Sequence, residues 1–379
     1  MESTGDVTVK KRNASFELLR IVAMLMIIGL HYNTHAQVLL QVGVPASGVK
    51  IYATITEAFF ITGVNTYVLL SGYFLSKGKI KPGKIIQLIC QIYFYTVLIS
   101  AAMMLVGTYS IHSGESAYKI VQYLFPISSE HYWFVTAYII MYVLAPVMNA
   151  AMENLSRGMM KAVIIGLLIW FSIIKSIVPV MFVTDHFGYD YGWFIVLYLI
   201  AAYIRKYDVA LFSNAKKSLG IFLASVVMIA GMSIGLYYLN LYRGGFNYYA
   251  EVPIHLNFIF TLTGSIGLFS FFRFYRMRES RFADVVRFVA PFTFGVYLLH
   301  MHLEIRDRWL LWLEHLIGEV PRNNVFLFAW HQLRCILIVF VAGIFVDWIR
   351  KMIVDFAERG LQGTKLSDKI KQWDENIDK

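Results

Sequence analysis

Charged residues are scarce in this chain. Lys, Arg, Asp and Glu together make up 15% of its 379 residues, 58% are hydrophobic, and the mean hydropathy is +0.59. Soluble domains carry about a quarter charged and about half apolar residues, so this composition excludes an ordinary soluble protein and indicates a polytopic membrane protein. The apolar runs leave no stretch long enough for a separate soluble domain.

The chain is also poor in cysteine and lacks the common catalytic motifs. Its two cysteines, Cys90 and Cys335, lie inside apolar runs without the spacing of metal ligands, so we expect buried free thiols and no metal. There is no nucleophile elbow of a Ser–His–Asp hydrolase, no Walker loop and no dinucleotide-binding glycine fingerprint. The sequence therefore indicates none of these three classes of enzyme.

Apolar windows of about 20 residues predict about ten membrane-spanning helices. Their predicted limits are 15–38, 52–76, 84–107, 132–151, 161–183, 190–206, 217–240, 251–273, 288–310 and 325–349. We therefore expect an all-α transmembrane helical bundle over residues 15–352. A short N-terminal segment (1–14) precedes it, and a C-terminal tail (353–379), polar after Gly360 and predicted to hold a short helix, follows it.

The positive charges predict the orientation of these spans. If the N-terminus is cytoplasmic, cytoplasmic segments hold 25 of the 34 Lys and Arg residues and outer loops hold four. This bias places both termini in the cytoplasm, as an even number of spans requires. It also explains the net charge of +10, so we expect no nucleic-acid partner. The basic cluster at 10–12 resembles the start of a signal peptide, but the long apolar run after it predicts a retained first span.

The first predicted span carries ionisable residues on one face. Arg20 and His31 are 11 positions apart. At about 100° and 1.5 Å per residue, both lie on the same helix face about 16 Å apart. Burying an ionisable residue in a membrane is costly, so such residues suggest a functional site. In the predicted orientation Arg20 lies near the cytoplasm and His31 lies beyond the midplane.

His31 is the best candidate for a catalytic base or nucleophile, because a neutral imidazole can take a proton from a hydroxyl at neutral pH. The alternative is a histidine that only bridges two helices. Arg20 offers a rigid guanidinium that suits a phosphate or carboxylate. Its alternative is a structural ion pair with Glu17, three residues earlier. A pair that holds the guanidinium until an anionic ligand arrives would combine the two roles.

Further polar residues lie within the second span and directly after it. The segment 77–84 holds four lysines, among them Lys77 and Lys81. It would attract a polyphosphorylated cofactor such as coenzyme A, or it is only a topology signal attracted to anionic lipid. Within the span, Asn65 and Tyr73 offer donors that could stabilise a developing oxyanion. The alternative is that they only join neighbouring helices.

Polar residues also gather toward the outer face. Glu57 enters the second span near its outer end, and His300, Glu304 and Arg306 follow one another on the predicted ninth span. On a continuous helix, His300 and Glu304 lie one turn apart, so the carboxylate could orient the imidazole. A purely structural network at the outer surface is an equally open interpretation.

Several of these stretches together match one family. They are Arg20 followed after ten residues by His31; Gly63-Val-Asn-Thr-Tyr-Val-Leu-Leu-Ser-Gly-Tyr-Phe-Leu75; His131-Tyr-Trp-Phe134 with Tyr138, Tyr142, Pro146 and Asn149; and Phe294-Gly-Val-Tyr-Leu-Leu-His300 with Arg306. On these residues the chain resembles the acyltransferase-3 family of integral-membrane acyltransferases, particularly bacterial members that O-acetylate surface polysaccharides. Each motif is weak alone, but the combination, in the family's order, is specific.

The resemblance implies a bundle of about ten helices in the bacterial inner membrane. It also implies an acyl-coenzyme A donor, most simply acetyl-coenzyme A, and functional roles for Arg20 and His31. Many members carry an Arg-x-x-x-Arg pair after the second span, where this chain has Lys77 and Lys81. Lysine keeps the charge but loses the bidentate fork.

We therefore expect a membrane O-acyltransferase that moves an acetyl group to a hydroxyl of a cell-surface glycan or its lipid-linked precursor. Arg20, Glu17, Lys77, Lys81, Tyr73 and Asn65 form the expected donor-binding set, and Glu57, His300 and Arg306 form the expected acceptor side. The alternative is a polysaccharide flippase or exporter, because a transport path would also need buried polar residues. Membrane lipids are expected partners, and self-association stays open.

Overall fold

The computed structural model describes residues 11–78, 81–106, 114–129, 131–361 and 365–376. The first part of the predicted N-terminal segment (1–10) and Lys79 of the basic segment lie outside the described residues. No strand occurs within the described ranges, which agrees with the predicted all-α class.

The described chain is built from α-helices. Those of the first half are α1 (Ala14–Ala36), α2 (Gly48–Phe60), α3 (Thr62–Leu75), α4 (Pro82–Leu105), α5 (Gly114–Leu124), α6 (Trp133–Asn154), α7 (Arg157–Leu168) and α8 (Ile174–Ile177). Those of the second half are α9 (Tyr191–Tyr207), α10 (Ala215–Arg243), α11 (Asn247–Glu251), α12 (Ile259–Phe274), α13 (Arg281–Val289), α14 (Thr293–His300), α15 (Trp309–Ile317), α16 (Val325–Leu361) and α17 (Lys365–Asn376). A π-helical turn (Ile169–Ile173) joins α7 to α8, and short 3₁₀ turns occupy Ala210–Phe212, Val252–Ile254 and Ala290–Phe292.

The predicted number of spans is confirmed. Nine helical segments of the described chain are long and apolar enough to cross a membrane. The tenth, α9, has 17 residues and corresponds to the predicted span at 190–206. α2 and α3 together form one span, from Gly48 to Leu75. The chain is therefore a multi-pass membrane protein, and α17 forms the short helix predicted after Gly360.

The ninth span differs from its prediction. It was expected at 288–310, but the apolar segment runs from Arg281 to His300, with a 3₁₀ turn at Ala290–Phe292 between α13 and α14. Pro291 explains this break, because proline lacks the N–H of a continuous helix. After His300 the chain makes turns, in which the carbonyl of His302 accepts from Ile305 and Arg306. Spacing arguments based on one helix therefore fail beyond His300.

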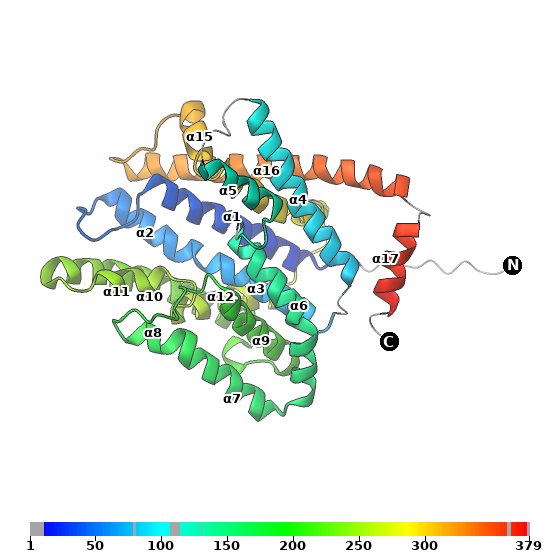
Figure 1. The fold of residues 1–379 in the computed structure, drawn as a ribbon. Helices are drawn as coiled ribbons and strands as arrows, with labels where there is room; N and C mark the ends of the chain where they lie inside the picture. Colours follow the sequence, from blue (N-terminus) through cyan, green and yellow to red (C-terminus); the bar gives the residue numbers. More distant parts are fainter. Residues whose placement is uncertain (1–10, 79–80, 107–113, 130, 362–364, 377–379) are drawn as a thin grey trace.

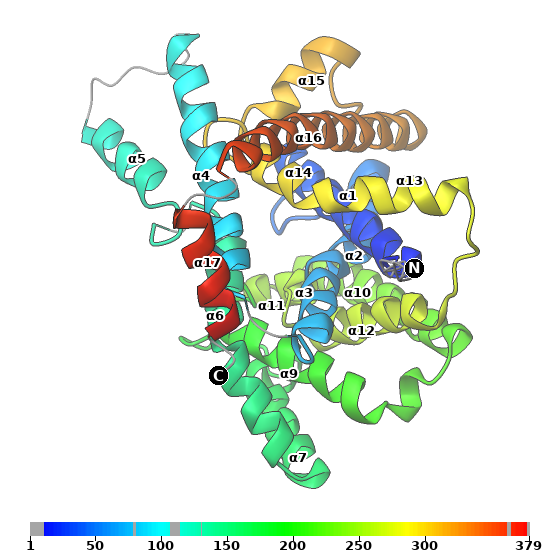
Figure 2. The same ribbon diagram turned by 90° about the vertical axis from the view of Figure 1, so that its right-hand side faces the viewer.

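α1 lies in the middle of the bundle. It packs against α2, α3, α13 and α16 and also contacts α12, α14 and α15 (Figures 1 and 2). Its contact with α3 depends on Gly63, since a Cβ there would lie 2.9 Å from Cβ of Met26 and 3.1 Å from the carbonyl oxygen of Ala23. Small residues permit such close approach between membrane helices. α1 is therefore surrounded by other helices, while the side chains of Arg20 and His31 stay partly accessible.

The two ends of the bundle are distinct. Figure 1 shows the first turn of α1 and α17 at one end, with α11, α15 and the start of α2 toward the other. At the first end the backbone N–H of Gly83, in the first turn of α4, donates to a carboxylate oxygen of Asp374 on α17, at 2.8 Å. We call this end, which holds the first turn of α1, the amino end of α1.

Candidate functional site

His31 and His300 meet inside the bundle. Nδ1 of His31, on α1, lies 3.0 Å from Nε2 of His300, the last residue of α14. The other ring nitrogen of His300, Nδ1, lies 2.6 Å from the carbonyl oxygen of Val296. His300 is buried, whereas His31 is partly accessible. The sequence suggested both residues but placed His300 with the acceptor groups, and the structure places it directly against His31.

A cavity of about 180 Å³ lies beside His31. α1 supplies one side of its lining, and aromatic residues from α3, α6, α14 and the loop before α9 supply much of the rest: Tyr67, Trp133, Phe134, Tyr189, Phe294 and Tyr297. Tyr189, which is 41% exposed, packs against Trp133 with ring centroids 4.8 Å apart. His31 and Thr34 add polar groups. The arrangement suits a small ligand with apolar faces held against one imidazole.

The cavity lies on the same face of α1 as Arg20. Met24, Ile27 and His31 line it and follow Arg20 by four, seven and eleven residues, which is one helical stripe. Arg20 stands at the amino end of this stripe, and about 16 Å of helix separate it from His31. The predicted shared face is therefore the face that borders the cavity.

Arg20 forms the ion pair that the sequence left open. Its Nη1 lies 3.2 Å from a carboxylate oxygen of Glu17, and Nη1 of Arg12 lies 3.7 Å from the same oxygen. The Glu17 side chain is 5% exposed and that of Arg20 is 31% exposed. Glu17 is therefore held between two guanidinium groups, and Arg20 keeps an accessible edge that can meet an anionic ligand.

The expected donor-binding residues occupy different environments. Lys77 and Lys81 are both exposed, and Lys81 directly precedes Pro82, the first residue of α4. Tyr73 packs against Phe16 of α1, with ring centroids 5.7 Å apart, and so lies near the amino end of α1. Asn65 is fully buried, donates to the carbonyl of Leu256 and accepts from Nε1 of Trp193. Its contacts are those of a residue that joins helices, and a role toward the donor stays a prediction.

Two arginines that the sequence suggested only as topology signals gather at Tyr73. The guanidinium carbon of Arg205, on α9, lies 4.7 Å from the centre of the Tyr73 ring, and that of Arg273, on α12, lies 5.8 Å from it. Arg205 also donates to the carbonyl of Tyr73, and Arg273 pairs with Asp208. Positive charge at this end therefore comes from several helices. The charge bias of the sequence predicted positive charge at this end, but nothing in the sequence indicated that Arg205 and Arg273 meet at Tyr73.

The remaining acceptor-side residues are bonded to neighbours. Glu57 is buried and accepts from Nδ2 of Asn33, whose Oδ1 accepts from Gln332. These bonds join α2, α1 and α16. Arg306 lies at the surface beside Asp307, at 3.3 Å. Of the three residues expected on the acceptor side, His300 is the one that the structure brings to His31.

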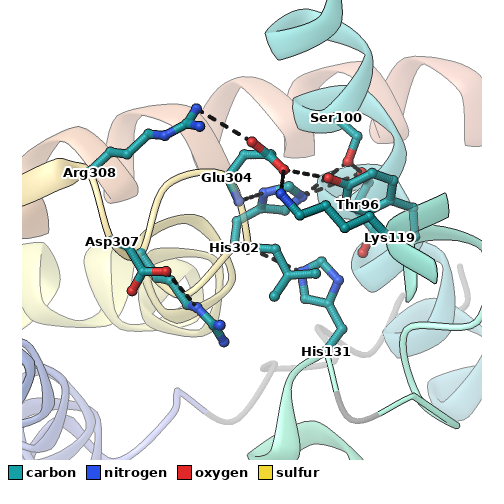
Figure 3. A network of polar contacts seen from close by, with 11 residues as sticks. Thr96, Ser100, Lys119, His131, His302, Glu304, Asp307 and Arg308 are labelled. Carbon is teal, nitrogen blue, oxygen red and sulfur yellow. Dashed lines mark hydrogen bonds and ion pairs between the residues drawn. The ribbon is translucent and has the colours of Figure 1, made fainter. Parts of the chain in front are cut away.

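Glu304 belongs to a separate network, which Figure 3 shows. Its buried carboxylate accepts from Tyr123 and lies 3.6 Å from Nζ of Lys119 and 3.4 Å from Nη1 of Arg308. It therefore neutralises surface cations and fastens α5 instead of orienting His300. Nearby, burial and the adjacent His302 ring lower the pKa of His131 to about 3, so this imidazole is neutral at physiological pH.

The family model described as an acyltransferase domain, of the acyltransferase-3 type, matches residues 13–348. No curated protein and no solved structure matches the chain. The matched range contains both histidines, Arg20 and every residue named above as lining the cavity. The chain belongs to this acyltransferase family.

Proposed function

We propose that this membrane acyltransferase moves an acetyl group from acetyl-coenzyme A to a hydroxyl of a cell-surface glycan or its lipid-linked precursor, in the bacterial inner membrane. The observation that carries the proposal is the single stripe of α1 that has Arg20 at one end and His31 beside an aromatic cavity at the other. A guanidinium suits phosphate, an imidazole suits proton transfer, and aromatic walls suit the apolar faces of a sugar ring.

The donor would enter from the amino end of α1, which the charge bias predicts to be cytoplasmic. Arg20 and the exposed Lys77 and Lys81 would hold its phosphates. The pantetheine arm is on the order of 15–20 Å long when extended, and Arg20 and His31 are separated by about 16 Å of helix. The arm therefore spans the distance from a phosphate at Arg20 to a thioester at His31.

His31 would act as the general base toward the acceptor hydroxyl. As the imidazole takes the hydroxyl proton, the oxygen attacks the thioester carbonyl and a C–O bond forms. The C–S bond then breaks, and the proton on His31 passes to the departing sulfur, so that the products are the ester and free coenzyme A. The alternative role of His31 is that of a nucleophile: its ring nitrogen would take the acetyl group as the C–S bond breaks and then pass it to the acceptor hydroxyl.

The test is acetyl transfer by the purified protein. With labelled acetyl-coenzyme A and an extract of lipid-linked or surface glycan as acceptor, the wild type should release free thiol and label the glycan. His31→Ala should lower the rate by at least about a hundredfold, because general base catalysis contributes that much or more. The matched control is His315→Ala, which changes an exposed histidine on α15 and should leave the rate unchanged.

Two outcomes would contradict the proposal. Transfer that survives in His31→Ala would remove the catalytic assignment. Export of glycan without turnover of acetyl-coenzyme A by the wild type would favour a flippase or exporter instead. The amount of each variant in the membrane and its size-exclusion profile in detergent show whether a lost activity reflects lost catalysis or misfolding.

A further inference from the structure

Three groups lie in a row behind the cavity: the Val296 carbonyl, His300 and His31. The distances along this row are 2.6 Å from the carbonyl oxygen to Nδ1 of His300 and 3.0 Å from Nε2 of His300 to Nδ1 of His31. Val296 and His300 are one turn apart on α14, and both are buried. Val296 itself is packed against α16, where a Cβ on Gly343 would lie 2.8 Å from its Cα. The row therefore starts from fixed backbone.

This row determines where the ring protons lie. A carbonyl oxygen can only accept, so Nδ1 of His300 carries a proton and donates to Val296. In the neutral ring Nε2 of His300 then holds a lone pair, and Nδ1 of His31 must donate to it. A neutral His31 protonated at Nδ1 has its lone pair at Nε2. That nitrogen is the one a general base needs.

We propose that His300 is a positioning residue, which fixes the Nδ1–H tautomer of His31 and leaves its Nε2 free to take a proton from the acceptor hydroxyl. The inference rests on the proposed acyl transfer and deepens it. An imidazole backed by a backbone carbonyl here has the part that a carboxylate has in a Ser–His–Asp triad. Glu304, the acid nearest to His300 in the sequence, is bonded to Tyr123, Lys119 and Arg308 instead.

The opposite proton arrangement would be inactive. If His300 gained a second proton, its Nε2 would donate, and Nδ1 of His31 would have to accept. Neutral His31 would then carry its proton at Nε2, with no lone pair for the hydroxyl. The other titratable groups around the pair are His35 on α1, Tyr67 on α3, Tyr297 on α14 and Tyr189 in the loop before α9, and Arg306, after α14, acts on His35 and Tyr297.

The same bond also supports the reaction once it has begun. When Nε2 of His31 takes the hydroxyl proton, the ring becomes positively charged and its Nδ1–H bond to the neutral His300 becomes charge-assisted, hence stronger. His300 neither gains nor loses a proton in the net reaction. The proton taken from the hydroxyl leaves on the sulfur of coenzyme A, and His31 returns to its starting state.

Two amide substitutions of different reach test the proposal. Glutamine at 300 can place a carbonyl oxygen near the position of Nε2 and accept from His31, whereas asparagine can only reach the position of Nδ1, near Val296. We expect His300→Gln to keep kcat within about tenfold of the wild type, and His300→Asn and His300→Leu to lose about a hundredfold or more, as for loss of a base. KM for acetyl-coenzyme A should stay within about twofold in all three.

A direct measurement reads the tautomer. With ¹⁵N-labelled histidine, and with the His31 signals assigned by their loss in His31→Ala, NMR should show Nε2 unprotonated in the wild type and in His300→Gln. His300→Asn and His300→Leu should show a mixture of tautomers. A merely structural role for His300 would move the rate through folding but would not move these signals.

A failure of the positioning role of His300 and a failure of the proposed acetyl transfer would give different results. If the wild type transfers acetyl groups, His31→Ala does not, and His300→Leu is within about threefold of the wild type, then His31 is the base and the positioning role is wrong. A wild-type His31 protonated at Nε2 would also overturn the positioning role. If the wild type shows no acetyl transfer, the proposed function itself fails, and the tautomer measurement still decides the arrangement of the two rings.

Discussion

The guanidinium of Arg20 is shared between a protein partner and an accessible edge. Glu17 occupies one side of it at 3.2 Å, and 31% of the side chain is exposed. A lysine would keep the charge and the Glu17 pair but could not form two parallel hydrogen bonds to a phosphate. The difference between these two side chains therefore separates recognition of an anion from structural neutralisation of Glu17.

For Arg20→Lys we expect KM for acetyl-coenzyme A to rise about tenfold, the equivalent of one lost charge-assisted hydrogen bond, with kcat lowered less than threefold. The measurement is initial rates in proteoliposomes over a range of donor concentrations. Arg12→Lys is the matched control, since Arg12 also pairs with Glu17, and it should change KM less than twofold. An equal rise in both variants would show that Arg20 acts through Glu17 alone.

The residues of the site were predictable to the extent that they are local. Arg20 and His31 share a face because a helix repeats every 3.6 residues, and that follows from one segment of sequence. The contact of His31 with His300 joins residues 269 positions apart, and no spacing rule within a segment could supply it. The aromatic lining of the cavity was missed for the same reason, since Trp133 and Tyr189 come from separate segments.

The same distinction between local and long-range signals holds for single helices. The apolar runs predicted the helices well, and α9 agrees with its predicted limits to within one residue at each end. The predicted limits of the ninth span were wrong because a hydropathy window does not detect a turn whose buried polar groups form hydrogen bonds with one another. His302 and Glu304 are buried, and the ring of His302 accepts from the backbone of Glu304. The apolar signal of Trp309 and its neighbours belongs to α15, a separate helix.

The loop between α8 and α9 is held by a buried ion pair. Nζ of Lys175 lies 2.5 Å from a carboxylate oxygen of Asp185, and the two side chains are 2% and 6% exposed. Burial raises the pKa of Asp185, but hydrogen bonds from Lys175, Asn257 and Tyr248 outweigh it, and the pKa lies below its ordinary value. Because Tyr189 of this loop lines the cavity, the pair also supports the rim of the site.

We expect Asp185→Asn to lower the free energy of unfolding by about 3–5 kcal/mol, because removing one partner leaves a buried charge. The sign of the pH dependence follows from the lowered pKa. The carboxylate contributes its stability fully above the ordinary value of 3.8, and this stability is lost as pH falls through the lower folded value. Thermal unfolding of detergent-solubilised protein between pH 3 and 7 measures both effects.

The control for this prediction is Asp307→Asn, which changes an exposed carboxylate paired with Arg306 and should shift the melting temperature by less than about 1 °C. Equal melting temperatures for Asp185→Asn and the wild type at pH 7 would contradict the role given to the ion pair.

The direction of the stripe from Arg20 to His31 is a property of the whole molecule. α1 is enclosed by helices from both halves of the chain, so a ligand that moves between Arg20 and His31 moves within protein. The described chain forms the expected helical bundle. The proposed direction of acetyl transfer rests on the distribution of Lys and Arg, of which 25 lie on the predicted cytoplasmic side and four on the other.

This orientation predicts which engineered cysteines an impermeant reagent can reach. Asn323, before α16, is exposed on the predicted outer side, and Ser213, before α10, is exposed on the predicted cytoplasmic side. The background is Cys90→Ser, because Cys90, which the sequence analysis expected to be buried, is exposed on the surface of α4, whereas Cys335 is buried as expected. In cells that have lost their outer membrane but keep an intact inner membrane, a charged maleimide should label Asn323→Cys at least about tenfold faster than Ser213→Cys. The reason is that the lipid bilayer keeps charged solutes from the cytoplasmic side.

After permeabilisation, both cysteines should be labelled at similar rates, and the Cys90→Ser background should stay unlabelled. The reverse order in intact cells would put Arg20 and the basic segment outside, where acetyl-coenzyme A does not reach them. His31 would then lie on the cytoplasmic side of Arg20, and an acyl donor of cytoplasmic origin could not approach it along α1 from the amino end. The labelling order therefore decides whether the stripe from Arg20 to His31 leads a donor outward.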